Sequence, residues 1–312
     1  MISKMVMVKR AVMAAFITSG ALLCMGLLIG CENAGGYVES EEHQSAGETE
    51  AVSATEPDET LVAEPMQTTG PVTPHESEGV SSSEIPEQAE TPKIVTDAEA
   101  DDFFNDSVFV GDSIMEGLAQ YVLAQRKNEP TLGDAKFLTT VNGIKLADCA
   151  GDMGDKTEYY MYKGSQRTVS QCIGDMGVSK VFIMLGTNDL GVGYGVAETV
   201  ERYSRTIDII SETSPHVEIF IELNTPRNAS SWLPSYITNK SFGNPLIDEF
   251  VNAVRIMCES RGLCYIDLNA ALKDENNALP EEFCRDGFDH INNAGAAVVV
   301  EALREFAKDV LS

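Results

Sequence analysis

The chain is 312 residues long and has 22 basic against 49 acidic residues, which gives a formal net charge of −27. So acidic a molecule repels phosphate backbones, which argues against a nucleic-acid partner and against charge-driven docking on anionic lipid. The length allows one or two domains, but the composition of the first third is unsuited to folding, so the folded part is expected later.

The first 31 residues have the pattern of an export signal. Three basic residues lie in the first ten positions, and an apolar run over residues 11–30 ends in Leu-Ile-Gly-Cys at Cys31. This ending resembles a bacterial lipobox, whose Cys is acylated and becomes the mature N-terminus. We therefore expect a lipoprotein signal peptide over 1–31, lipidation of Cys31 and anchoring at the extracytoplasmic face of the cell membrane. An uncleaved signal anchor is the alternative, because the run is long enough to span a bilayer.

Residues 32–96 are expected to form a disordered acidic tether. Between positions 32 and 92 there are fifteen acidic residues and no Lys or Arg, among many Ser, Thr, Pro and Gly residues. Such a segment cannot bury enough apolar surface to offset its chain entropy. Removing this −15 and the +3 of the signal from the total charge leaves −15 for residues 93–312.

Over residues 97–312 strands and helices alternate, which predicts a mostly parallel sheet with helices on both faces. Five strands are expected, near residues 107–110, 135–141, 179–185, 217–223 and 263–268. A helix is expected near 114–125, directly after the first strand. Apolar residues at helical spacing predict three more helices, near 196–210, 247–257 and 299–310. The predicted fold class is α/β, a flavodoxin-like three-layer α/β/α sandwich around a five-stranded sheet.

A long segment, residues 224–245, separates the fourth strand from the next helix. It holds Trp232, the only Trp of the chain, together with Pro234, Tyr236 and Phe242. Structureless loops of this length are usually functional or mobile. We interpret the segment as a substrate-side loop, with a plain surface excursion as the alternative.

Four chemically suggestive residues follow strands, at the carboxyl edge where open parallel sheets bind ligands. Ser113 follows the first strand in Val-Gly-Asp-Ser, and Gly143 follows the second in Val-Asn-Gly-Ile. Asn188 follows the third in Leu-Gly-Thr-Asn-Asp, and His290 follows the fifth in Asp-Gly-Phe-Asp-His. Each motif alone is weak, but their joint order is much more specific.

In this order the motifs resemble those of the SGNH/GDSL hydrolase family, over roughly residues 105–310. The resemblance implies a serine esterase without cofactor or metal, in which Ser113 is the nucleophile and His290 its base. It assigns the oxyanion hole to the backbone N–H groups of Ser113 and Gly143 and to the side-chain amide of Asn188. Asp112 and Asp189 are expected to brace their loops by local hydrogen bonds rather than to react.

The sequence departs from the family at the acid of the triad. The family has Asp three residues before the histidine, and that position is Gly287 here. We prefer Asp286, because a turn at Gly287 absorbs one extra residue and lets the carboxylate reach back to His290. Asp289, or a Ser–His dyad without an acid, are the alternatives.

Counts of His and Cys bear on metal binding. Of four histidines, His43 and His75 fall in the tether and His216 precedes the fourth strand, at the opposite end of the sheet. One histidine near the site is too few for a typical catalytic zinc, so no metal is expected. The five Cys residues after Cys31 lack the spacings of a disulfide framework or a zinc site.

The expected reaction is hydrolysis of an O-acyl ester, with an O-acetyl group on a polysaccharide or a small molecule as the expected substrate. An O-acyltransferase that uses the same site is one alternative. A non-catalytic surface-displayed binding module is another, which the altered triad acid would permit. The sequence does not indicate an oligomeric state.

Overall fold

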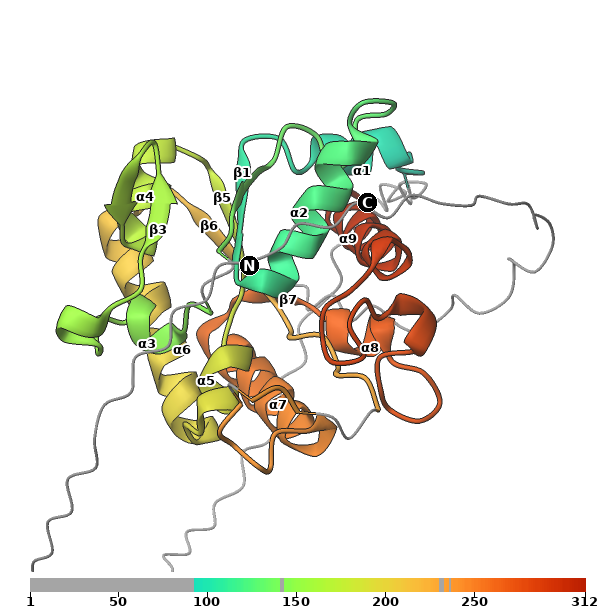
Figure 1. Cartoon of the computed structure of the whole chain (residues 1–312). Helices are drawn as coiled ribbons and strands as arrows, with labels where there is room; N and C mark the ends of the chain where they lie inside the picture. Colours follow the sequence, from blue (N-terminus) through green and yellow to red (C-terminus); the bar gives the residue numbers. More distant parts are fainter. Residues whose placement is uncertain (1–92, 141–142, 230–232, 236) are drawn as a thin grey trace, which may run out of the picture. The chain divides into compact units, whose positions relative to one another are not determined.

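The computed structural model describes residues 93–140, 143–229, 233–235 and 237–312 (Figure 1). The signal segment with Cys31 and residues 32–92 of the tether lie outside the described residues and stay predictions, and so do Trp232 and Tyr236 of the long loop. The first described helix is α1 (Asp97–Asp102). Thr96 caps it through a reciprocal pair of hydrogen bonds with Glu99.

Five parallel strands form one sheet, in the order β2-β1-β5-β6-β7. The strands are β1 (Ser107–Gly111), β2 (Lys136–Leu138), β5 (Lys180–Met184), β6 (Glu218–Glu222) and β7 (Cys264–Ile266). This confirms the predicted α/β fold with its five-stranded sheet, and the strand order is the flavodoxin-like one.

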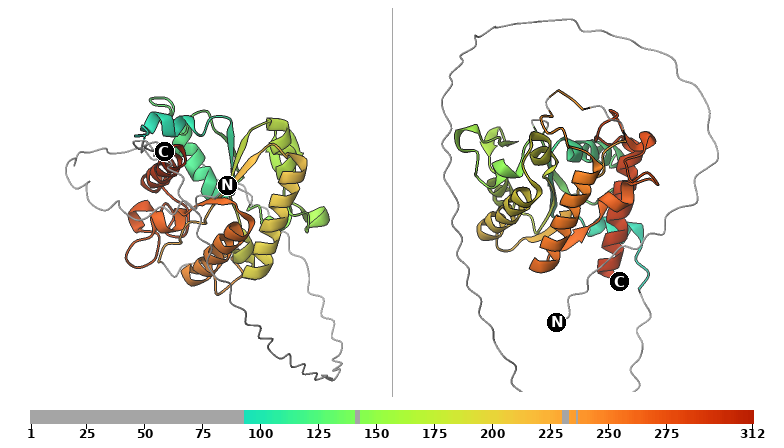
Figure 2. Two further views of the ribbon diagram at one scale, coloured as in Figure 1. Left: turned by 180° about the vertical axis from the view of Figure 1, so that it is seen from behind. Right: turned by 90° about the horizontal axis from the view of Figure 1, so that it is seen from below.

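Helices cover both faces of the sheet (Figures 1 and 2). Around α9 (Asn293–Leu311) pack α1, α2 (Ser113–Gln125) and α8 (Leu268–Leu272). Around α6 (Val196–Thr213) pack α3 (Leu146–Cys149), α4 (Val169–Met176), α5 (Thr187–Val192) and α7 (Asn244–Arg261). Each group encloses its own apolar cluster, because alternate residues of a strand face opposite ways: Val108 belongs to one cluster and Phe109 to the other.

A row of phenylalanines crosses the α2–α9 face of the sheet. Phe109 stacks on Phe137 and on Phe182, with ring centroids 5.4 and 4.7 Å apart, and Phe182 stacks on Phe220 at 4.7 Å. The stacked residues are also register partners of neighbouring strands. A one-residue slip would turn a ring to the other face, so the row fixes the register of four strands.

Several short elements were not predicted. They include an antiparallel hairpin of β3 (Tyr160–Tyr162) and β4 (Ser165–Arg167), the 3-10 turns η1 (Gly154–Lys156) and η2 (Glu281–Phe283), and α3, α4, α5 and α8. Within the described ranges, no helix combines the length and the apolar character that a membrane span requires. The five described cysteines are free thiols.

Candidate active site

The first strand and helix present Ser113 at a tight turn. Strand β1 ends at Gly111, and a Cβ there would lie 2.4 Å from Cβ of Met115, so only glycine fits this connection. Asp112 caps α2 by accepting a hydrogen bond from Ile114 N at 3.0 Å, the local brace expected from the sequence. Ser113 is therefore the first residue of α2. Its backbone N–H has no acceptor inside the helix, and the free N–H groups of this first turn create a positive potential at the helix N-terminus.

The structure brings together Ser113, His290 and Asp286. Oγ of Ser113 lies 2.9 Å from Nε2 of His290, and Oδ2 of Asp286 lies 2.5 Å from Nδ1 of the same ring. The backbone at Gly287 has φ +71°, and Oδ1 of Asp286 accepts a hydrogen bond from Phe288 N at 2.9 Å. The turn expected at Gly287 is present, and Asp286 reaches back to the imidazole.

Asp289 is a second carboxylate at the same ring nitrogen. Its Oδ1 lies 3.3 Å from Nδ1 of His290, and the residue is only 6% exposed. Burial raises the pKa of Asp289 to about 7. Burial also acts to raise the pKa of Asp286, but hydrogen bonds from His290 and from Phe288 N outweigh it and lower that pKa. Asp286 is thus the group that is ionised at neutral pH and placed to orient His290.

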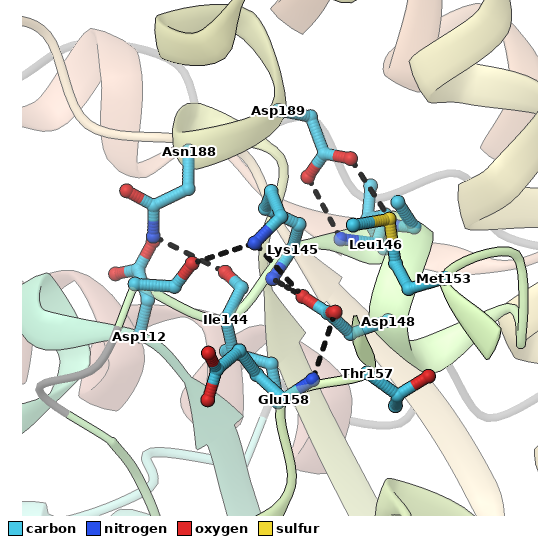
Figure 3. Close-up of polar contacts among 12 residues, drawn as sticks. Asp112, Ile144, Lys145, Leu146, Asp148, Met153, Thr157, Glu158, Asn188 and Asp189 are labelled. Atoms are coloured by element: carbon cyan, nitrogen blue, oxygen red, sulfur yellow. Dashed lines mark hydrogen bonds and ion pairs between the residues drawn. The ribbon is translucent and has the colours of Figure 1, made fainter. Parts of the chain in front are cut away.

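Asn188 lies at the start of α5, beside Asp112 of the loop that bears Ser113 (Figure 3). Its Nδ2 donates to Oδ2 of Asp112 at 3.0 Å and to the carbonyl of Ile144 at 3.1 Å. A carboxylate only accepts hydrogen bonds when ionised, so Asp112 fixes which end of the Asn188 amide faces it. Burial raises the pKa of Asp112 to about 6, which leaves it mostly ionised at neutral pH.

A third loop brings Gly143 to the same place. Gly143 directly precedes Ile144, whose carbonyl binds Asn188, and its φ is +71° with open space where a Cβ would lie. Asp189 holds the segment that follows, because its two carboxylate oxygens accept from Leu146 N at 2.7 Å and from Ala147 N at 3.1 Å (Figure 3). Sequence reasoning expected Asp189 to brace its own loop; instead it bonds to a helix more than forty residues earlier.

Asp148 reinforces this segment and was missed by sequence reasoning. Its side chain is buried and accepts hydrogen bonds from Lys145 N at 2.8 Å and Glu158 N at 3.0 Å (Figure 3). Its Oδ2 also lies 3.2 Å from Nζ of Lys145. The bond to Glu158 N could not be read from the sequence, because a backbone N–H ten residues away is brought close only by folding.

The sequence matches the GDSL-like lipase/acylhydrolase family over residues 109–298, a range that includes Ser113, Asn188 and His290. The chain belongs to this family. It is accordingly a hydrolase that acts on ester bonds. No curated protein matches the sequence.

Solved structures similar to this GDSL hydrolase include a GDSL-like lipase from Bacteroides thetaiotaomicron, 14% identical, with a TM-score of 0.49. That alignment covers 65% of this chain and 88% of the other. A carbohydrate esterase family 3 protein from Talaromyces cellulolyticus is 16% identical, with a TM-score of 0.45, over 65% of this chain and 98% of the other.

The long loop of the hydrolase is tied to the segment that bears His290. The guanidinium of Arg227 lies over the rings of Phe242 and Phe288, 4.5 and 4.1 Å from their centroids. Asn228 N also donates to the carbonyl of Phe288 at 2.7 Å. The described start of the loop therefore supports the segment that bears His290.

His216 lies before β6, at the amino end of the sheet and away from Ser113, as expected.

The described residues contain one group whose ligand atoms are close enough to hold a metal ion: Asp286, Asp289 and His290, with atoms within 4.8 Å of one another. Both ring nitrogens of His290 already face Ser113 and Asp286. A metal on Nδ1 would displace Asp286 from the imidazole, so this arrangement fits proton transfer better than metal binding.

Proposed function

We propose that this GDSL hydrolase is a serine esterase that forms an acyl-enzyme on Oγ of Ser113. The observation that supports this best is the 2.9 Å contact of Ser113 with Nε2 of His290, whose other nitrogen faces Asp286. His290 removes the hydroxyl proton as Oγ attacks the ester carbonyl, and Asp286 stabilises the imidazolium that forms. The same proton then passes from Nε2 to the departing alcohol, and water repeats the sequence to release the acid.

Three donors would stabilise the tetrahedral intermediate: the backbone N–H groups of Ser113 and Gly143 and the amide of Asn188. Both amide protons of Asn188 are already donated, to Asp112 and to the carbonyl of Ile144. To bind an oxyanion, Asn188 would therefore have to break one of these two hydrogen bonds and donate that proton to the substrate oxygen. We propose that the bond to Ile144 is exchanged, because the ionised carboxylate of Asp112 is the stronger acceptor.

The proposed substrate is a short O-acyl ester, an O-acetyl group, on a carbohydrate. A groove of about 470 Å³, which begins one turn of α2 after Ser113, presents the polar side chains of Gln120, Arg285, Asn292 and Asn293 beside Gly117, Ile291 and Ala294. Such a lining suits a hydroxyl-rich alcohol better than a long acyl chain. The lipobox-like ending at Cys31 supports a lipid-anchored enzyme at the extracytoplasmic face of the membrane, with the acidic segment 32–96 as its tether.

The test is covalent labelling of the purified protein with a fluorophosphonate, together with hydrolysis of 4-nitrophenyl acetate. Labelling at Ser113 and loss of both signals in Ser113→Ala are expected. Ser170→Ala, a change of a buried serine on α4, serves as the control and should behave like the wild type. Unchanged hydrolysis by pure Ser113→Ala would overturn the proposal. Adding a sugar alcohol as acceptor and measuring ester formation distinguishes a transferase from a hydrolase.

A further inference from the structure

A groove of about 470 Å³ lies between the first half of α2, the helix that Ser113 begins, and the start of α9, and it also includes both chain neighbours of the five-residue segment 286–290 that ends in His290. Helix α2 contributes Gly117 and Gln120, so the Cα of Gly117 lies about 6 Å along the helix axis from that of Ser113. The histidine segment contributes Arg285 and Ile291, and the start of α9 contributes Asn292 and Asn293. Helices α2 and α9 are in contact, and Figures 1 and 2 show them on the same side of the sheet.

The position of the groove indicates which part of an ester it would hold. Nε2 of His290 must deliver a proton to the departing alcohol, so the alcohol lies on the side of His290. The carbonyl oxygen faces the other way, toward Gly143 and Asn188. Gly143 precedes α3 and Asn188 lies in the first turn of α5, and both helices pack in the apolar cluster on the opposite face of the sheet from α2 and α9. The groove therefore suits the alcohol part of the substrate.

Arg285 differs from the other arginines in the described part of the chain. Each of the others has a hydrogen bond or an ion pair from its guanidinium: Arg126, Arg167, Arg202, Arg205, Arg227, Arg255, Arg261 and Arg304. Arg285 is exposed, and its side chain makes neither kind of contact with a described residue. Among the described arginines, Arg285 is thus the one whose guanidinium has no hydrogen bond or ion pair, in a part of the chain whose net charge is −15. The planar guanidinium group of an arginine can donate two parallel hydrogen bonds to a carboxylate or a phosphate.

We propose that this groove, in the esterase proposed above, binds the alcohol part of the substrate and that Arg285 binds an anionic group on it. The preferred substrate is then an O-acylated alcohol that bears a carboxylate or a phosphate, such as an acidic sugar. The polar side chains of Gln120 and Asn293 supply further hydrogen bonds to hydroxyl groups along the groove.

The test compares aryl acetates that differ only in the charge of the alcohol. The substrates are 4-acetoxybenzoate, its neutral methyl ester and 4-acetoxyphenyl phosphate, and the release of each phenol gives kcat/KM. The measured quantity is the ratio of kcat/KM for an anionic ester to that for the neutral ester. A disturbance of the neighbouring Asp286 would change both values and cancel in the ratio. Comparison of the two anionic substrates shows whether Arg285 prefers a carboxylate or a phosphate.

Arg285→Gln should lower this ratio roughly fivefold, the upper range for an exposed ion pair, and Arg285→Glu should lower it further. High salt should lower the ratio of the wild type as well, because it screens exposed charges. Arg255→Gln, a matched change on α7, should leave the ratio as it is. If Arg285→Gln does not move the ratio for either anion, the groove proposal is overturned while the esterase stands. If the wild type cleaves none of the esters, the proposed function fails and the proposal made here fails with it.

Discussion

Two carboxylates compete for Nδ1 of His290, and their surroundings separate them. Asp286 is partly exposed and lies 2.5 Å from the nitrogen, whereas Asp289 is buried and lies 3.3 Å away. Hydrogen bonds lower the pKa of Asp286 against the effect of burial, and burial raises the pKa of Asp289 to about 7. Distance and charge both favour Asp286 as the residue that orients the imidazole.

Asp286→Asn should therefore reduce kcat severely while the protein stays folded. An Asn in place of the acid favours the wrong tautomer of the imidazole, and the equivalent change in a serine protease costs about 10⁴ in kcat. Asp289→Asn is the matched control and should cost less than about tenfold. Steady-state hydrolysis of an aryl acetate, with thermal unfolding of each variant, checks this. The reverse ranking would assign the role to Asp289, and two benign variants would indicate a dyad.

Glu222, at the end of β6, is a buried acid outside the proposed catalytic steps. It is fully buried, and neither carboxylate oxygen accepts a hydrogen bond from a described residue. Burial raises its pKa to about 8 from an ordinary value of 4.5. Between these two pH values the native protein holds a proton that the unfolded chain has released. The free energy of unfolding must therefore fall as the pH rises through this window.

Glu222→Gln should remove that fall in stability. Between pH 5 and pH 8, the free energy of unfolding of the variant should rise relative to that of the wild type by on the order of 3 kcal/mol. Each unit by which the pKa of Glu222 is raised corresponds to about 1.4 kcal/mol. Urea unfolding at several pH values measures the difference. Asp112 and Asp289, whose pKa values are also raised, contribute equally to both proteins. Glu249→Gln, at an exposed position on α7, is the control; equal slopes for Glu222→Gln and wild type would contradict the prediction.

At the scale of elements, helix α3 positions the loop of Gly143 but has only four residues. A helix so short is not stable on its own. Its first N–H groups are held by Asp189 of α5, and Asp148, within α3 itself, accepts hydrogen bonds from Lys145 N and Glu158 N. The placement of Gly143 therefore depends on carboxylates outside the reacting atoms.

Asp189→Asn should loosen this loop. The amide has one acceptor oxygen where the carboxylate has two, so one of the buried N–H groups of Leu146 and Ala147 would lose its partner. We expect a loss of about 1–3 kcal/mol in the free energy of unfolding and a lower kcat. Urea unfolding and aryl acetate hydrolysis measure both. Asp155→Asn, an exposed acid in η1, should change neither; an Asp189→Asn variant as stable and active as the wild type would refute this account.

The sequence predicts some elements better than others, for physical reasons. Strands such as β1 and β5 are continuous apolar runs buried on both faces, so composition alone marks them. Strand β2 is shorter than the predicted 135–141, because it is the edge strand and its first residue is exposed. The hairpin of β3 and β4 has three residues per strand and a mostly exposed β4, so it has no periodicity to detect.

In the candidate site, too, the sequence predicts some residues and not others. Ser113, Asn188 and His290 follow strands in recognisable motifs, and the turn that brings Asp286 to His290 could be anticipated from Gly287. The link from Asp189 to α3 could not, because its partners are backbone N–H groups far away in the chain, and backbone groups leave no mark in a sequence. Arg285 likewise stands out only once the partners of every other described arginine are known.

On the scale of the whole molecule, the described part has two apolar clusters of its own on the two faces of one sheet. Helix α1 belongs to this part: Ala100 is buried, and Asp101 forms an ion pair with Arg304 of α9 at 2.8 Å. The acidic segment before it lacks the composition to add to either cluster. The folded unit is therefore expected to begin at α1 and to need nothing earlier for its stability.

Deleting residues 32–92 should leave the thermal midpoint and the kcat/KM for an aryl acetate within error of the full chain. Extending the deletion to residue 104 removes α1, with buried Ala100 and Phe104, and should lower the midpoint by several degrees. Calorimetry and esterase assays on the two deletions give the comparison. A clear drop in the midpoint for the shorter deletion would mean that the acidic segment packs on the folded part.

The row of phenylalanines has a consequence for the time course of folding. Phe109 can meet Phe137 soon after it leaves the ribosome, but Phe182 and Phe220 follow much later in the chain. Until β5 is made, one edge of β1 exposes unpaired N–H and C=O groups beside an uncovered aromatic ring, an arrangement prone to aggregation. Parallel pairing over such separations forms slowly. The step that joins β1 to β5 is accordingly the one expected to limit refolding, and nascent chains that end before β5 are the most exposed to misassembly.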